Sequence, residues 1–281
     1  MRPHEFDPEN PSHLSALRKL AEQAARAGGD VARRLFRTEF TIRRKTDGSE
    51  VTDADEAAQV AVVKVIQEQR DHDAIIAEEV LDSTQASPAA GNENLCWVID
   101  PIDGTRNYVR GVPYYAVSVA VMYGGFTLAG AIHEVERDVM YSASRTEGLL
   151  LNGQPRQKMQ WENVIAGRAC KPLAGIPSSL QGAAYEVVRQ WASRVVVRNL
   201  GSTAMHLAMV AAGHFQAALI SDSRLWDIAA GGLMIDLSGG VMTTLDGRPI
   251  FPFDVSTYAG EAIPSLAASD AELHARLLPA K

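Results

Sequence analysis

Between residues 95 and 155 the chain carries a series of short apolar runs, and this series constrains the fold more than any other feature of the sequence. Runs of this length, rich in β-branched residues and separated by a glycine pair or a charged stretch, predict consecutive β-strands. The predicted strands span residues 95–99, 116–123, 126–133, 139–143 and 148–155. A sheet of this size needs helices to bury its faces, so the flanking segments should supply them.

Helical patterns lie on both sides of this region. Ser12 is predicted to cap a helix whose apolar positions begin at Leu14 and Leu17, and a second helix is predicted over 55–69. Further helices are predicted after a cap at Ser178, at 202–212 and at 226–238, and further strands at 194–197, 215–220 and 241–244. We therefore predict an α/β fold. An α+β N-terminal lobe over 1–150 and an α/β C-terminal lobe over 151–281 would share one core in a compact unit.

Composition narrows the class of protein. Of the 281 residues 46% are hydrophobic, which is typical of a globular chain and excludes a disordered or fibrous one. The net charge of −7 argues against a nucleic-acid partner, because phosphate binding needs a basic surface. No apolar stretch reaches the ~18 residues of a membrane span, and two cysteines, Cys96 and Cys170, are too few for a disulfide framework. We therefore expect a cytoplasmic protein without nucleic-acid or membrane contacts.

Acidic side chains gather where predicted strands end or the next helix begins. They are Glu78 and Glu79, Asp100 and Asp103, and Asp227. Ligand sites of layered α/β proteins form at the carboxyl ends of strands, so these acids can converge. Carboxylates in one small space repel one another unless cations neutralise them. A ligand set made only of oxygen suits Mg²⁺ or Mn²⁺ rather than zinc.

The segment after Asp103 adds a possible anion site. Gly104-Thr105 lies where a turn or helix begins, and backbone N–H groups exposed there bind phosphate well. Carboxylates for two metals beside such a cradle are the arrangement used for phosphoester hydrolysis. Each piece alone has an ordinary explanation, since Asp-x-x-Asp is usually a solvated turn and Asp227 can be a helix-terminal charge. Only their joint occurrence points to a metal site. His206 and His214, by contrast, are predicted to pack or cap.

Four segments resemble the signature of the inositol monophosphatase family, in that family's order and spacing. They are Trp97-Val-Ile-Asp-Pro-Ile-Asp-Gly-Thr105, Trp226-Asp-Ile-Ala-Ala-Gly-Gly232 with Ser238-Gly-Gly240, Lys45-x-Asp-Gly-Ser-x-Val-Thr-x-Ala-Asp55, and the pair Glu78-Glu79. Segments 148–153 and 201–204 also fit, so the resemblance runs from about residue 12 to residue 260. It implies a layered αβαβα sandwich of the sugar-phosphatase type, a homodimer, and Mg²⁺-dependent hydrolysis of phosphomonoesters.

The resemblance also assigns roles by position. About two to three Mg²⁺ ions, with Mn²⁺ as a substitute, would be held by Glu78, Asp100, the carbonyl of Ile102, Asp103 and Asp227. Thr105 and Asp55 would orient and deprotonate the attacking water. Glu79 would be the third catalytic residue. The phosphate or substrate contacts would come from Gly104, Thr105, Arg106, Lys45, Asp222 and Ala204.

Three departures from the family pattern stand out. Ala77 and Val80 bracket Glu78-Glu79 where the family usually has Gly and Ser, and the other two departures concern the substrate. Arg106 stands where inositol phosphatases carry Thr, and Ile220 stands where they carry the inositol-binding Glu, with Asp222 two residues away as a replacement. We expect hydrolysis of a small polyol or sugar phosphate, with inositol 1-phosphate as the reference substrate. Alternatives are histidinol phosphate, fructose bisphosphate or a nucleotide 3′-phosphate, and a non-catalytic regulatory protein with the same fold.

Overall fold

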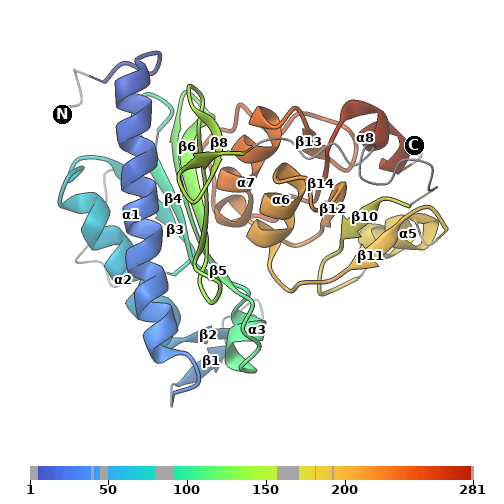
Figure 1. Cartoon of the computed structure of the whole chain (residues 1–281), viewed down its shortest axis with the longest axis horizontal. Helices are drawn as coiled ribbons and strands as arrows, with labels where there is room; N and C mark the ends of the chain where they lie inside the picture. The colour runs from blue at the N-terminus through green and yellow to red at the C-terminus, as the bar shows by residue number, and fades with distance from the viewer. Residues whose placement is uncertain are drawn as a thin grey trace.

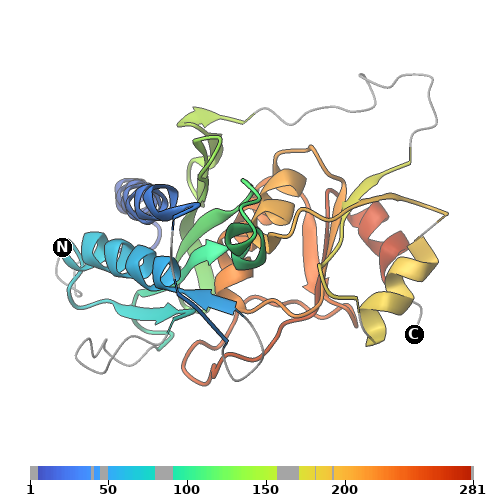
Figure 2. The ribbon, with the colours of Figure 1, turned by 90° about the horizontal axis from the view of Figure 1, so that it is seen from below.

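The computed structural model describes residues 6–38, 41–44, 50–79, 91–156, 171–180, 182–191 and 193–279. Its elements form five layers, in the order helices, sheet, helices, sheet, helices (Figures 1 and 2). The helices are α1 (Pro11–Leu35), α2 (Asp53–Gln67), α3 (Thr105–Val109), α5 (Gly182–Trp191), α6 (Thr203–Ala211), α7 (Leu225–Leu237) and α8 (Ala271–Leu277). This is the αβαβα arrangement expected from the sequence.

The larger sheet has seven strands and contains the apolar runs of residues 95–155. Its order is β3 (Ala74–Ala77), β4 (Cys96–Asp103), β5 (Ala116–Tyr123), β6 (Phe126–Glu134), β7 (Val139–Ser144), β8 (Gly148–Leu151) and β9 (Gln154–Pro155). β3 and β4 pair in parallel, and every later pair is antiparallel. Helices α1 and α2 cover one face, and α6 and α7 cover the other (Figure 1).

The smaller sheet has five strands. Its order is β11 (Val196–Arg198), β10 (Leu173–Gly175), β12 (Ala217–Ile220), β14 (Ser265–Ala268) and β13 (Val241–Thr244). β11, β10 and β12 run parallel, whereas β14 is antiparallel to both of its neighbours. On β12 the side chains alternate: Leu219 packs with α5 and α8, and Ile220 packs with α6 and α7. A hairpin of β1 (Ile42–Arg44) and β2 (Glu50–Thr52) stands apart from both sheets.

The long first helix shows why local sequence signals misplace a boundary. The predicted cap at Ser12 is wrong, because the Asn10 side chain accepts the N–H of Ser12 at 2.9 Å and Pro11 takes the first helical position. Gly28 sits in the middle of α1 without ending it. A Cβ at Gly28 would lie 2.6 Å from a methyl of Val62, so the glycine lets α1 and α2 approach closely.

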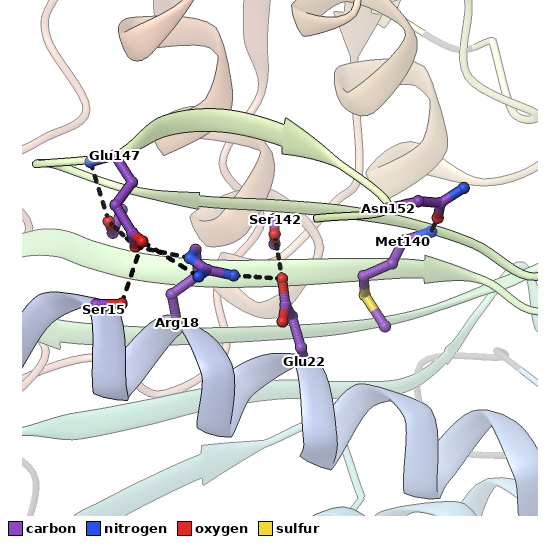
Figure 3. A network of polar contacts seen from close by, with 8 residues as sticks. Ser15, Arg18, Glu22, Met140, Ser142, Glu147 and Asn152 are labelled. Atoms are coloured by element: carbon purple, nitrogen blue, oxygen red, sulfur yellow. Dashed lines mark hydrogen bonds and ion pairs between the residues drawn. The ribbon is translucent and has the colours of Figure 1, made fainter. Parts of the chain in front are cut away.

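A buried charged network fastens α1 to the larger sheet (Figure 3). Arg18 is only 5% exposed. Its guanidinium donates to Glu22 at 2.5 Å on the same helix and to Glu147 at 2.7 Å in the turn between β7 and β8. Glu22 also accepts the hydroxyl of Ser142, on β7, at 2.5 Å. Each buried charge therefore has a partner, which is the condition for keeping an arginine inside a fold.

Most predicted elements are present, with shifted ends. The strand predicted over 95–99 is too short, because β4 continues through Asp103. The division into two lobes near residue 150 stays a prediction. None of the helices in the described ranges combines the length and the apolar character needed to cross a membrane.

Candidate active site

A cavity of about 190 Å³ opens between the end of β4 and the first turns of α6 and α7. One wall is made by residues 103–106, and the opposite wall by residues from 201–206 and 222–227. The other lining residues are Glu50, Glu78, Pro177 and Ser178. The cavity thus lies between segments far apart in the sequence.

Three aspartates place carboxylate oxygens within 4.8 Å of one another: Asp100, Asp103 and Asp227. In a regular strand Asp100 and Asp103 would face opposite sides, since side chains alternate. Here the pairing of β4 with β5 shifts register between them, so that Asp100 lies opposite Ser118 and Asp103 opposite Ala116. Those two partners are two residues apart and share a face, so the bulge turns both carboxylates to the same side.

The bulge has a local cause. Pro101 has no N–H to give to the ladder, and proline inside a sheet is confined to such interruptions. The Asp100 carboxylate accepts the N–H of Ile102 at 3.0 Å across the bulge. Gly104 follows with φ of 99°, a left-handed conformation that glycine adopts without strain, and it starts α3.

Asp227 reaches the cluster from the first turn of α7. Its carboxylate accepts the N–H of Arg224 at 2.6 Å, so the residue also caps the helix. Glu78, at the end of β3, lines the same cavity. Asp227 therefore caps the start of α7 and also belongs to the carboxylate cluster.

The electrostatics of the cluster are unfavourable without a cation. Burial, with repulsion from neighbouring carboxylates, raises the pKa of Asp100 well above its ordinary range. Burial first, and then the charges of Asp103 and Glu78, raises the pKa of Asp227 to about 8. The pKa of Asp103 rises to about 6, again mainly through burial. The hydrogen bond between Asp100 and Asp227 adds to the rise of the pKa of Asp100.

Asp103 is held by the start of α6. Its carboxylate accepts the hydroxyl of Ser202 at 2.5 Å and the backbone N–H groups of Thr203 at 3.2 Å and Ala204 at 2.6 Å. Thr203 also shares a 2.7 Å hydrogen bond with Ser223, in the loop before α7. The start of α6 thus links β4 to the α7 side of the cavity.

A threonine–aspartate pair lies beside the cluster. The hydroxyl of Thr105 is 3.2 Å from Asp55 Oδ1 and 3.0 Å from the carbonyl oxygen of Ile102. Asp55 is fully buried, and its other oxygen accepts the N–H of Thr52 at 2.8 Å and its hydroxyl at 2.6 Å. Burial raises the pKa of Asp55 to about 6, and the charge of Glu78 contributes to the rise.

The residues predicted to contact phosphate or substrate fall into three groups. Gly104, Thr105, Arg106 and Asp222 line the cavity. Ala204 is fully buried, and its N–H already donates to Asp103, so it supports that carboxylate. Lys45 lies outside the described residues.

Two other residues singled out in the sequence, Glu79 and Ile220, do not line the cavity. Glu79 is 8% exposed and is not among the cavity-lining residues, and its backbone exchanges two hydrogen bonds with the side chain of Gln59. Ile220, expected at the position of a substrate-binding Glu, is 1% exposed and packs in the core between the sheets. The equivalence of Ile220 to a substrate-binding Glu stays a prediction, and its side chain is not among those that line the cavity. Asp222 lines it without any shift of the loop.

Several cavity residues escaped the sequence argument. Ser178 was expected to cap a helix, but α5 begins at Gly182 and Ser178 lines the cavity. His206 also lines it. The expectation of a packing role is confirmed for His206, which is 3% exposed, accepts the N–H of Leu200 at 3.0 Å, and has its pKa lowered to about 4 by burial. On this wall, only segment 201–204 gave a signal in the sequence, through its fit to the family resemblance.

The donor set suits a divalent cation that prefers oxygen. In the part of the chain that the structure describes, the clustered groups are three carboxylates without histidine or cysteine. Their raised pKa values record mutual repulsion and desolvation, which a cation of charge +2 would relieve. The cluster can therefore bind a metal ion, and its chemistry matches Mg²⁺ or Mn²⁺.

Comparison with known proteins identifies the family of this chain. The model of the inositol monophosphatase family matches residues 13–280. The Nus factor SuhB of Pasteurella multocida is 28% identical over 240 residues, covering 83% of this chain and 87% of that protein. A putative Nus factor SuhB of Neisseria meningitidis serogroup B is 30% identical over 239 residues, with 84% and 86% covered.

Solved structures show the same fold. An extragenic suppressor protein suhB from Bartonella henselae superposes with a TM-score of 0.77 at 23% identity, covering 93% of this chain and 96% of that one. An IMPase from Thermotoga maritima gives a TM-score of 0.77 at 23% identity, with 95% of each chain covered. The family match spans both sheets and every residue of the carboxylate cluster. The chain belongs to the inositol monophosphatase family.

Proposed function

We propose that the protein is a Mg²⁺-dependent phosphomonoesterase that hydrolyses a small polyol or sugar phosphate. The observation that carries the proposal is the hydrogen-bonded pair Thr105–Asp55, because Thr105 lines the same cavity as Asp103 and Asp227. A site that only bound a metal would need no buried aspartate hydrogen-bonded to a hydroxyl at its edge. Hydrolysis needs such a pair, because the attacking water must lose a proton.

Each part of the site has a role in this proposal. About two to three ions per chain would be held by Glu78, Asp100, the Ile102 carbonyl, Asp103 and Asp227. Bound Mg²⁺ would supply positive charge that offsets the phosphate and favours ionisation of water. The backbone at Gly104 and Thr105 would hold the phosphate at the start of α3.

The proton route follows from the hydrogen bonds. Thr105 Oγ1 accepts a proton from the attacking water while its own hydroxyl proton passes to Asp55, 3.2 Å away. With a pKa of about 6, Asp55 is largely ionised at neutral pH and still basic enough to take the proton. The two hydrogen bonds from Thr52 hold the carboxylate in place.

The outer wall favours a compact, hydroxyl-bearing leaving group. Arg106 and Asp222 line the cavity beyond the carboxylate cluster and offer one donor and one acceptor group. Glu50 completes that wall, with its carboxylate 3.0 Å from Arg110. We therefore propose that inositol 1-phosphate is hydrolysed without strong preference over histidinol phosphate, fructose bisphosphate or a nucleotide 3′-phosphate.

A panel assay tests this function. Inorganic phosphate released from these four substrates would be measured with Mg²⁺, with Asp100→Asn as the control for contaminating phosphatases. We expect turnover of at least one compact phosphomonoester by the wild-type protein and none above background by the variant. Absence of turnover on the whole panel, in protein shown to bind Mg²⁺, would instead favour the non-catalytic alternative.

One observation supports the hypothesis of a non-catalytic regulatory protein. Several relatives carry the name Nus factor SuhB. A non-catalytic protein of this fold would still keep its core. It would gain nothing from the desolvated Asp55 beneath Thr105, and this favours the enzyme. We also propose a cytoplasmic homodimer, and sedimentation velocity would report the oligomeric state.

A further inference from the structure

A second cavity, of about 330 Å³, lies between the beginning of β6 and the C-terminal half of α7. It shares no lining residue with the candidate active site. Polar and apolar atoms line it in equal measure, and the apolar part includes the rings of Phe126 and Phe251 with Leu233, Met242 and Ile250. The volume falls at the lower end of the ~300–1,000 Å³ range of small-molecule sites, so an occupant would be small.

The floor of this cavity carries a hydroxyl without a partner. Thr127 pairs directly with Met122 across the sheet, and Met122 packs in the core on the α7 side. Directly paired residues share a face, so the Thr127 side chain points to α7 and to the cavity. Thr127 is 2% exposed, and no described residue hydrogen-bonds its Oγ1. A buried hydroxyl left unpaired is costly, and a ligand that bonds it recovers that cost.

The rim of the cavity carries one pair of opposite charges. Arg145 donates from Nε to the carbonyl of Thr127 at 2.9 Å, and its guanidinium lies over the ring of Phe126, 5.5 Å from the centroid. Arg145 Nη1 is 3.4 Å from Asp236, whose side chain is 64% exposed. The rim is therefore fixed in position and neutral overall, so it complements a head group that carries both charges better than a simple anion or cation.

We propose that this cavity binds a free aromatic amino acid whose ring carries a polar atom, tryptophan or tyrosine. The carboxylate of the ligand faces Arg145 and its ammonium faces Asp236. The ring lies between Phe126, Phe251 and the aliphatic side chains, where aromatic and methionine contacts favour it. The indole N–H or the phenol hydroxyl reaches Thr127 Oγ1 at the floor.

Calorimetric titration of the Mg²⁺-loaded protein with L-tryptophan tests the proposal without any activity assay. We expect saturable binding of one molecule per chain. L-phenylalanine, which lacks the polar ring atom, should bind about tenfold more weakly. Tryptamine and indole-3-propionate, each with one of the two charges, should also bind more weakly than L-tryptophan. No saturable binding of L-tryptophan below about 10 mM, an affinity of ~3 kcal/mol, would overturn the proposal.

Two substitutions locate the site. Thr127→Val keeps the shape and removes the hydroxyl, so it should weaken L-tryptophan about tenfold and leave L-phenylalanine unchanged. Arg145→Gln should weaken both amino acids, whereas Arg189→Gln, which breaks a surface ion pair on α5 instead, should weaken neither. Circular dichroism would verify that each variant is folded. Unchanged L-tryptophan binding by folded Thr127→Val would show that the cavity is not the site.

Discussion

Replacing Asp55 by Asn should stabilise the metal-free protein while it abolishes hydrolysis. The native fold raises the pKa of Asp55 from 3.8 to about 6, so the folded state binds this proton more tightly than the unfolded state does. The stability that the neutral carboxyl contributes is fully present below pH 3.8 and is lost as the pH rises through about 6. Asparagine never ionises and keeps an oxygen to accept from Thr52.

The magnitude follows from the shift. Each unit of pKa corresponds to about 1.4 kcal/mol, so ionised Asp55 costs about 3 kcal/mol of unfolding free energy at pH 8. At pH 5 only part of the cost applies, ~1.5 kcal/mol, because most of the native carboxyl is still protonated. The advantage of Asp55→Asn over the wild type should therefore grow by ~1.5 kcal/mol between pH 5 and pH 8.

Urea unfolding in excess chelator at the two pH values measures this difference. Asp254→Asn is the matched control, because that carboxylate is exposed and the hydrogen bonds from Ser256 lower its pKa. Because the pKa of Asp254 is lowered, its substitution should have the same effect on the stability at pH 5 and at pH 8. If Asp55→Asn alters the stability equally at both pH values, the native fold does not raise the pKa of Asp55 to about 6, and this argument is refuted.

Further substitutions separate chemistry, metal binding and core packing. Asp100→Asn should fold and lose at least ~10³-fold in kcat, because it removes a carboxylate from the centre of the cluster; near-normal turnover would exclude it as a metal ligand. Thr105→Val should lose ~10²-fold in kcat while Thr105→Ser keeps most activity, since only the hydroxyl relays the proton; equal losses would point to a packing role. Ile220→Glu should lower the unfolding free energy by ~3 kcal/mol or more in urea titrations, because it buries a charge. Val196→Glu, at an exposed position, is the control and should have little effect. An Ile220→Glu variant as stable as the wild type would show that residue 220 is accessible to water.

The sequence predicted the larger sheet well because most of its strands are local apolar runs bounded by glycine or charge. The strands β5 and β13 match their predicted ranges, and β6 and β7 end one residue later than predicted. The strand β14 and the helix α8 were missed. Ser265–Ala268 is short and made mostly of small residues, and it becomes a strand through its antiparallel pairing with the distant β12. No pattern within four residues encodes such a partner.

The candidate site also contains features that the sequence predicted and features that it did not. The convergence of Asp100, Asp103 and Asp227 could be expected from their places at strand and helix ends. The bulge that puts the first two on one face has a local cause in Pro101, whereas its pairing partners on β5 could not be predicted. The burial of Ile220 depends on which face of β12 meets α7, and a one-residue difference reverses that face. Positions defined by register therefore stayed beyond the sequence argument.

The most direct test of the account is phosphate release from inositol 1-phosphate by metal-stripped protein as Mg²⁺ is added back. The account predicts no release in excess chelator, because the clustered carboxylates would then face the phosphate without neutralising charge. It predicts that release returns with Mg²⁺ in the wild-type protein and stays absent in Asp100→Asn. Equal rates with Mg²⁺ and in excess chelator would contradict the metal-dependent site.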